Sequence, residues 1–271
     1  MSGARLRLGR LFNRESGRSF VAAIDHGVSI GVPSGAERAV EAVARVIDCE
    51  PDAVLIAPGM LAKTGDLFAF RGAPVPIVRA DWLINDPRLA EMGEAYRVLV
   101  SPTHAVHLGG EAFIMFLILG VEEGAMFADN VRAVATAAEE AHKVGLPLLV
   151  EVVAWGARTT AAGTRKDADL LAFGCRMAAE LGADAVKTEW TGDVASMRQV
   201  IEGCPAPVLV LGGPKTETPE PTLAATRGAM EAGARGVVYG RNVWQADDPL
   251  GVSRQLREII HGQAVVAESR G

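Results

Sequence analysis

The sequence predicts a single (β/α)8 barrel, and three observations support this fold. Eight short apolar runs, rich in β-branched residues, alternate with longer segments that are rich in Ala, Glu and Arg and have a helical period. Eight such strands with intervening helices in 271 residues fit a closed parallel barrel better than a doubly wound sheet. No linker rich in Pro, Gly or Ser and no low-complexity segment interrupts the pattern, so we predict one domain over residues 1–271.

The predicted strands have the length of buried strands in a parallel sheet. In chain order they cover residues 19–25, 52–57, 75–80, 112–119, 146–153, 183–190, 206–213 and 235–240. Helical segments between them cover 35–48, 127–145, 167–182 and 221–233, and several end on a glycine placed to terminate a helix. Residues 81–101 are less regular and are predicted to form an excursion with a short helix.

The composition excludes several classes of function. With 49% hydrophobic and 22% charged residues the chain is globular, and a net charge of −6 with 5% aromatic residues argues against nucleic-acid binding. The longest apolar run, 112–121, is too short to span a bilayer, so we expect no membrane partner. The three cysteines are isolated, which argues against disulfides and zinc sites and fits a cytoplasmic setting. No other grouping has metal-ligand spacing, so we expect no metal.

A lysine interrupts the sixth predicted strand, where apolar residues lead into it. An ammonium buried without a partner costs on the order of several kcal/mol, and it tends to lose its proton instead. A neutral buried amine is a nucleophile, so Lys187 is our candidate catalytic residue. The alternatives are a snorkelling side chain or an ion pair with Glu189 or Asp193.

Polar residues and glycines follow other strands at the carboxyl end of the predicted barrel, where barrel enzymes carry their chemistry. Asp25 and His26 close the first strand, and they are either catalytic or caps of the following turn. The sequences GGPKT and GRN follow strands seven and eight, a common place for a phosphate site, although Gly and Pro also form ordinary turns. The candidate phosphate ligands there are Gly212, Gly213, Lys215, Gly240 and Arg241.

Four motifs together resemble the archaeal-type class I fructose-bisphosphate aldolases and their relatives. They are DHG at 25–27, ADAVKTEWTGD at 183–193, GGPKT at 212–216 and GRNVWQ at 240–245. The resemblance implies a barrel in which Lys187 forms a Schiff base with a ketone, Asp25 assists proton transfer, and the glycines with Arg241 hold a phosphate. A protonated imine is an electron sink, which stabilises the enamine formed when a C–C bond breaks.

The loop after the fifth strand departs from the family. The family places a proton-donating tyrosine there, but residues 151–160 contain none, and the matching position is Gly156. The resemblance therefore leaves proton transfer to Asp25, His26, Glu189, the substrate phosphate or a water. Glu189 also stands where relatives often carry a second lysine.

Further residues near this loop are candidate substrate ligands. Trp155 and Glu189 are assigned to the substrate site, with packing as the alternative for the indole. Arg158 binds a substrate carboxylate or phosphate, or else forms a surface salt bridge. Glu151, at the end of the fifth strand, is either a site residue or only the partner of a barrel cation.

These departures favour specialised relatives over ordinary fructose-bisphosphate cleavage. We expect a metal-independent and cofactor-free class I aldolase that uses a phosphorylated ketose or triose donor such as dihydroxyacetone phosphate. The acceptor would be aspartate semialdehyde, as in the aminoheptulosonate-phosphate synthases, and the chain would form a homo-oligomer. The alternatives are ordinary fructose-bisphosphate cleavage, a non-catalytic sugar-phosphate-binding barrel, or thiolase-like acyl transfer on a phosphorylated dione. The phospho-autoinducer-2 thiolase also lacks the tyrosine and shares the KT pair and an EGCP segment before strand seven.

Overall fold

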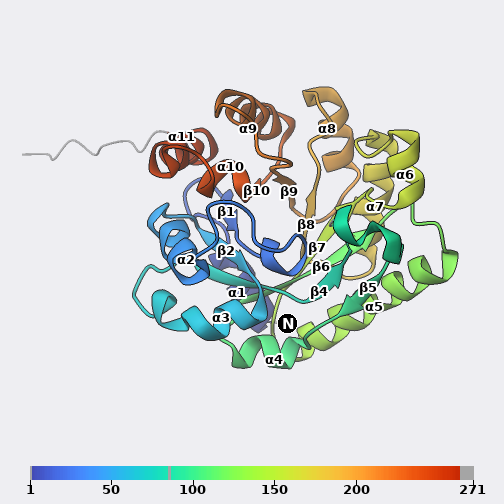
Figure 1. Ribbon diagram of the computed structural model, residues 1–271, viewed down its shortest axis with the longest axis horizontal. Coiled ribbons are helices and arrows are strands. Elements are labelled where there is room, and N and C mark those ends of the chain that lie inside the picture. Colours follow the sequence, from blue (N-terminus) through green and yellow to red (C-terminus); the bar gives the residue numbers. More distant parts are fainter. Residues whose placement is uncertain (1, 85–86, 263–271) are drawn as a thin grey trace, which may run out of the picture.

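The computed structural model describes residues 2–84 and 87–262. Its centre is a closed barrel of eight parallel strands surrounded by helices (Figure 1). Going round the barrel, the strands are β1 (Ser19–Ala23), β2 (Ala53–Ile56), β3 (Val75–Arg79), β6 (Ala112–Ile118), β7 (Leu148–Val153), β8 (Ala185–Thr188), β9 (Val208–Leu211) and β10 (Gly236–Tyr239). Each lies within one of the eight predicted runs, which confirms the predicted fold. The assignment of all 271 residues to one domain stays a prediction.

The outer surface of the barrel is covered by amphipathic helices that follow the strands. The main apolar cluster joins the outward-facing strand residues to the buried faces of these helices. The covering helices are α2 (Ala39–Asp48), α3 (Pro58–Thr64), α4 (Pro102–His107), α5 (Gly124–Lys143), α6 (Ala157–Ala162), α7 (Ala168–Glu180), α8 (Val194–Glu202), α9 (Glu220–Ala232), α10 (Arg241–Trp244) and α11 (Pro249–His261).

The interior of the barrel is a separate, smaller apolar cluster. Inward-facing residues such as Leu55, Ile77 and Leu149 fill it, as expected where branched side chains stack in layers. The helix α1 (Ser2–Arg10) precedes Leu11, which is buried in this same cluster, and Phe12 packs against it. The segment that follows α1 therefore contributes to the barrel interior rather than to the outer helical layer.

Residues 81–98 form an excursion between β3 and α4, as predicted, but with more order than expected. An antiparallel pair, β4 (Asp81–Leu83) and β5 (Tyr96–Val98), is accompanied by a 3-10 turn at Pro87–Met92. The sequence analysis missed the two strands because three residues are too few to show a period of two. The hairpin matters for the site because β4 begins at Asp81, two residues after the end of β3.

Candidate active site

The layer of the barrel interior nearest the carboxyl ends of the strands is charged instead of apolar. Arg79, Phe116, Glu151 and Lys187 each follow by two residues an inward-facing apolar residue of the same strand. Successive inward positions are two residues apart, so these four side chains point into the barrel. Glu151 on β7 and Lys187 on β8 are register partners on neighbouring strands. The sheet itself therefore brings an amine and a carboxylate together at this end of the barrel.

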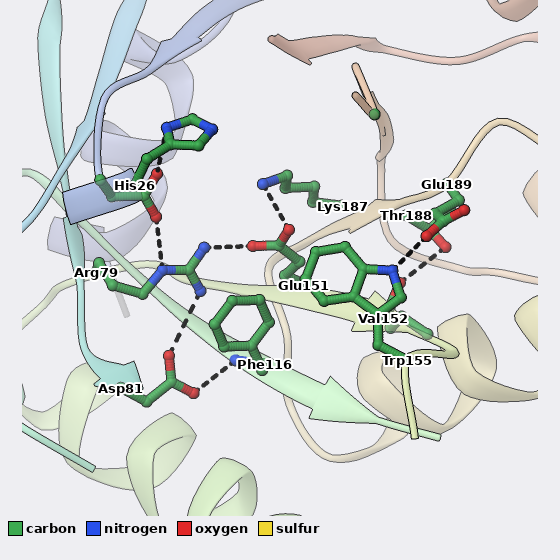
Figure 2. Close-up of polar contacts among 12 residues, drawn as sticks. His26, Arg79, Asp81, Phe116, Glu151, Val152, Trp155, Lys187, Thr188 and Glu189 are labelled. Carbon is green, nitrogen blue, oxygen red and sulfur yellow. Dashed lines mark hydrogen bonds and ion pairs between the residues drawn. The ribbon is translucent and has the colours of Figure 1, made fainter. Parts of the chain in front are cut away.

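Lys187 is buried and paired. Its Nζ lies 2.6 Å from Glu151 Oε1, and the residue is 6% exposed. The sequence analysis left open a pair with Glu189 or Asp193, and that alternative is wrong: the partner is Glu151. Glu151 Oε2 accepts from Arg79, and this contact leaves Oε1 directed at the Lys187 amine (Figure 2).

The Arg79 guanidinium lies at the centre of the charged cluster, in contact with three carboxylates. Its Nε donates to Asp25 Oδ2 at 2.9 Å, and a terminal nitrogen donates to Glu151 Oε2. The other terminal nitrogen lies 3.4 Å from Asp81 Oδ1, and Asp81 Oδ2 accepts the backbone N–H of Phe116 at 2.7 Å. The Phe116 ring also faces the guanidinium, with its centroid 4.0 Å from Arg79 Cζ.

Burial and the neighbouring charges set the protonation states of this cluster. Burial favours the neutral form of Asp25, but Arg79, with smaller effects from His26 and Lys187, outweighs it and lowers the pKa of Asp25. Burial raises the pKa of Asp81 to about 6, although Arg79 opposes the shift. Burial also lowers the pKa of His26, so its imidazole is neutral at pH 7.

The ends of β9 and β10 form the opposite side of the same cavity. Gly213 has a φ of +65°, which favours glycine, and a Cβ on Gly240 would lie 2.3 Å from His26 Cε1. Asn242 donates to the carbonyl oxygens of Gly212 and Pro214 at 2.8 and 3.0 Å, which ties the two loops together. This end of the site is therefore built from backbone held in close approach.

Arg241 is the cation on this side. One terminal nitrogen lies 3.3 Å from the Gly213 carbonyl oxygen, and its Nε is buried with no hydrogen-bond partner among the described residues. Burial lowers the pKa of Arg241, and no carboxylate offsets that effect. A half-buried guanidinium with an unused donor is suited to an anion.

A single cavity of about 110 Å³ collects most of the residues predicted from the sequence. Eight of them line it: Asp25, His26, Trp155, Lys187, Gly212, Gly213, Gly240 and Arg241. A larger hollow of about 940 Å³ lies at the opposite end of the barrel, bordered by Asp52 and Val75 where strands begin. Its arginines Arg10 and Arg257 are already paired with Glu111 and Glu50, and barrel enzymes use the carboxyl end of the strands, so we place the site in the smaller cavity.

Three predicted ligands do not line this cavity. Arg158 is exposed and donates to the Glu122 carbonyl oxygen at 2.7 Å. Lys215 is exposed and borders a different hollow, beside α11. Glu189 is buried, accepts the indole N–H of Trp155 and lies 3.7 Å from Arg165. The Trp155 ring thus forms the cavity wall, and Glu189 supports it from the side of the indole nitrogen (Figure 2).

The sequence analysis missed Arg79, Asp81 and Arg165, and it left the role of Glu151 open. The signal that singled out Lys187, a charge inside a buried strand, is also present at Arg79 in the run VPIVRA. Glu151 is confirmed as the partner of a barrel cation. Asp81 begins a strand of only three residues and Arg165 lies in a turn between α6 and α7, so no periodic pattern marked them.

Gly156 has no room for a side chain. A Cβ at this position would lie 2.1 Å from Gly120 C and 2.2 Å from Val121 N, and these are backbone atoms that cannot turn aside. The loop after β7 therefore packs directly on the loop after β6. In this backbone only glycine fits at the position where the resemblance places the family's tyrosine.

The cavity combines a buried amine beside a carboxylate, a second carboxylate near a neutral imidazole, and an open guanidinium. Within residues 2–84 and 87–262, no three His, Cys, Asp or Glu side chains are grouped as metal ligands, and no helix is long and apolar enough to cross a membrane.

The barrel fold and the buried lysine together define the class of Schiff-base-forming lyases. Residues 19–246 match the model of the DeoC/LacD family aldolases, and the chain belongs to this family of class I aldolases.

Relatives of known sequence agree with this membership. An uncharacterised aldolase of Saccharolobus solfataricus is 34% identical over 99% of this chain and 98% of its own length. The fructose-bisphosphate aldolase class 1 of Thermoproteus tenax is 33% identical, with 96% and 95% covered. The 2-amino-4,5-dihydroxy-6-oxo-7-(phosphonooxy)heptanoate synthase of Streptomyces griseus is 30% identical, with 98% and 93% covered.

Solved structures agree as well. An archaeal fructose 1,6-bisphosphate aldolase superposes with a TM-score of 0.82 at 29% identity, covering 96% of this chain and 99% of the other. A second archaeal structure, with the catalytic lysine covalently bound to the carbinolamine intermediate, gives a TM-score of 0.81 at 29% identity, with 96% and 100% covered. The expected family and fold are thus confirmed.

Proposed function

We propose that this aldolase joins a singly phosphorylated ketone donor, dihydroxyacetone phosphate, to an acceptor aldehyde without phosphate. The observation that carries the proposal is the number of cationic side chains in the cavity that have no carboxylate partner. Among the described residues that line it, Arg79 and Lys187 face carboxylates, the imidazole of His26 is neutral, and Arg241 alone has no carboxylate partner. One open guanidinium fits one phosphate, whereas a sugar bisphosphate would need a second cationic site.

Lys187 is the nucleophile in this proposal, and Glu151 carries its proton. Glu151 Oε1 accepts a proton from Nζ, and the neutral amine attacks the ketone carbon to form a carbinolamine. Glu151 then returns the proton to the carbinolamine hydroxyl, which leaves as water and gives a protonated imine. The tyrosine absent at position 156 is replaced by a carboxylate already in contact with the amine.

Asp25 serves the next step, on the other side of the Arg79 guanidinium. With its pKa held low it is ionised at neutral pH, and it removes a proton from the carbon next to the imine to give the enamine. The enamine attacks the acceptor aldehyde, whose oxygen takes up a proton as the new C–C bond forms. The neutral His26, whose Nδ1 lies 4.0 Å from Asp25 Oδ1, is positioned to share that proton.

The acceptor side of the cavity supports the choice of an unphosphorylated aldehyde. Trp155 forms the wall there, and Glu189 and Arg165 next to it are paired and neutral in sum. The two residues that the sequence offered as additional phosphate ligands, Arg158 and Lys215, do not line the cavity. We assign aspartate semialdehyde as the acceptor because a relative that matches over 98% of this chain is a synthase of an amino-heptanoate phosphate.

Borohydride trapping tests the donor assignment. Incubation with dihydroxyacetone phosphate and borohydride should add one reduced donor to the intact mass of the wild type, at Lys187. The variant Lys187→Met should remain folded by circular dichroism and show no adduct, since its side chain has similar length but no amine. A wild-type protein that gives no adduct contradicts the Schiff-base proposal.

Comparison of acceptors tests the rest of the proposal. With dihydroxyacetone phosphate as donor, turnover should be faster with aspartate semialdehyde than with glyceraldehyde 3-phosphate, and Glu189→Lys should narrow that difference by adding a cation. Faster cleavage of fructose 1,6-bisphosphate would establish the ordinary aldolase activity instead. Activity that depends on coenzyme A and a phosphorylated dione would establish acyl transfer.

A further inference from the structure

Arg79 is buried at a place where barrel interiors carry apolar side chains. It is 2% exposed, and its three carboxylate partners come from three different parts of the chain: the loop after β1, the start of β4 and the middle of β7. Buried ion clusters are often no more stable than apolar residues of the same size, so stability alone does not account for it. We therefore look for a role of the Arg79 ion cluster in the reaction.

The contacts of Arg79 fix the orientation of both carboxylates that the mechanism uses. It holds Oε2 of Glu151, which leaves Oε1 at 2.6 Å from the Lys187 amine. It holds Oδ2 of Asp25, which leaves Oδ1 toward His26. A rotation of either carboxylate would remove its free oxygen from the reacting atoms, and such small displacements are costly to the rate.

Two further groups, the Asp81 carboxylate and the Phe116 ring, hold the Arg79 guanidinium in place. Asp81 accepts from one terminal nitrogen of Arg79, and the backbone N–H of Phe116 donates to the other oxygen of Asp81. The Phe116 ring covers the flat face of the guanidinium. The fork of an arginine can bind three partners at once in fixed directions, which the single ammonium of a lysine cannot do.

We propose that Arg79 is a positioning residue that aligns Glu151 and Asp25 for their separate proton transfers, with Asp81 as its anchor. This inference rests on the proposed function. Arg79 lines the same cavity, but its hydrogen bonds are to Asp25, Asp81 and Glu151 and not to the phosphate site or Trp155, so it should affect the rate of the chemistry and not the binding of the donor.

The test compares Arg79→Lys with the wild type, with Arg7→Lys as the matched control. Arg7 donates to the Gly145 carbonyl oxygen at 2.6 Å, far from the cavity, so the control loses the same fork elsewhere. Arg79→Lys should lower kcat by about a hundredfold while KM for dihydroxyacetone phosphate stays within about threefold. Arg7→Lys should leave both within about twofold.

A pH profile adds a readout that a merely structural residue would not move. The charged and titratable groups that face Asp25 are Arg79, His26 and Lys187. Arg79 has the strongest of these effects, so its removal in Arg79→Gln should raise the pKa of Asp25, and the acid limb of kcat/KM should move to higher pH.

The outcomes separate the two proposals. If the wild type is not trapped by borohydride, the proposed function fails and this inference fails with it. If the wild type is trapped but folded Arg79→Lys keeps its kcat within threefold, or the limb stays in place, only the role of Arg79 is overturned. If the Arg79 variants do not fold, Asp81→Asn decides: a fall in kcat of about tenfold at unchanged KM supports the role, and unchanged kcat overturns it.

Discussion

At the scale of single residues, Gly156 leaves no room for the tyrosine that the family resemblance places at this position. Its φ and ψ of −60° and 155° are open to any L-residue, so the exclusion is steric and comes from the neighbouring loop at Gly120 and Val121. In the proposed mechanism proton transfer at the amine therefore belongs to Glu151, whose Oε1 lies 2.6 Å from Lys187 Nζ.

Substitution at this glycine should therefore destabilise the fold. Gly156→Ala should lower the free energy of unfolding by about 2 kcal/mol or more, because a methyl group would have to move two backbone segments apart. The matched control is Gly124→Ala, at the start of α5, where a Cβ meets nothing within 4 Å and alanine should be neutral or slightly stabilising. Equal stability of the two variants in urea denaturation would show that the loop yields easily.

Arg241 should bind the phosphate of the donor and not its ketone. Arg241→Ala should raise the Kd for dihydroxyacetone phosphate by about ten- to a hundredfold, which corresponds to the loss of about 1.5–3 kcal/mol for a charge-assisted contact. Dihydroxyacetone, which has no phosphate, should be almost unaffected. The measurement is Kd for both ligands on both proteins; an equal loss for the two would make Arg241 a structural residue.

At the scale of elements, the segment at the end of α1 supports the barrel from within. Leu11, directly after α1, is 2% exposed and packs in the interior cluster with Leu55 and Ile77, whereas Leu6 within α1 is 72% exposed. A barrel interior that lacked this contribution would expose apolar strand residues at its amino end. The amino-terminal segment is thus part of the core, although it precedes the first strand.

The two leucines form a matched pair for measurement. Leu11→Ala should lower the free energy of unfolding by about 2–4 kcal/mol, because it removes buried methyl groups and leaves a cavity. Leu6→Ala should change it by less than about 0.5 kcal/mol. Thermal or urea denaturation of both variants checks this, and similar losses would mean that α1 packs differently from its described position.

At the scale of the whole molecule, the charged layer inside the barrel makes stability depend on pH. Three carboxylates, Asp25, Asp81 and Glu151, surround two cations, Arg79 and Lys187, in a region closed to solvent on most sides. The excess of negative charge is consistent with the raised pKa of Asp81, which burial produces despite the contact with Arg79. The folded chain therefore keeps a proton that the unfolded chain would release.

This linkage has a definite sign. Because the pKa of Asp81 rises from 3.8 to about 6 on folding, its contribution is fully present below pH 4 and is lost as the pH rises through 6. That loss should be about 2 kcal/mol in the free energy of unfolding between pH 4 and 6. In Asp81→Asn the decline over this window should be smaller by that amount, as urea titrations at each pH would show. An identical slope in both proteins would place the pKa of Asp81 near its ordinary value.

The sequence alone predicted the barrel, because the alternation of strands and helices depends on local periodicity and all eight apolar runs contain a strand. It also predicted that Lys187, the two glycine-rich ends and Arg241 lie near one another, because parallel strands of a barrel all end at the same rim. It did not predict that Glu151 and Arg79 face Lys187 and Asp25, since the pairing depends on strand register and on which side chains reach across the barrel. Nor did it predict that Arg158 and Lys215 lie outside the cavity, or that Gly156 is closed by another loop. Those features depend on contacts between segments distant in the chain, which only the tertiary structure decides.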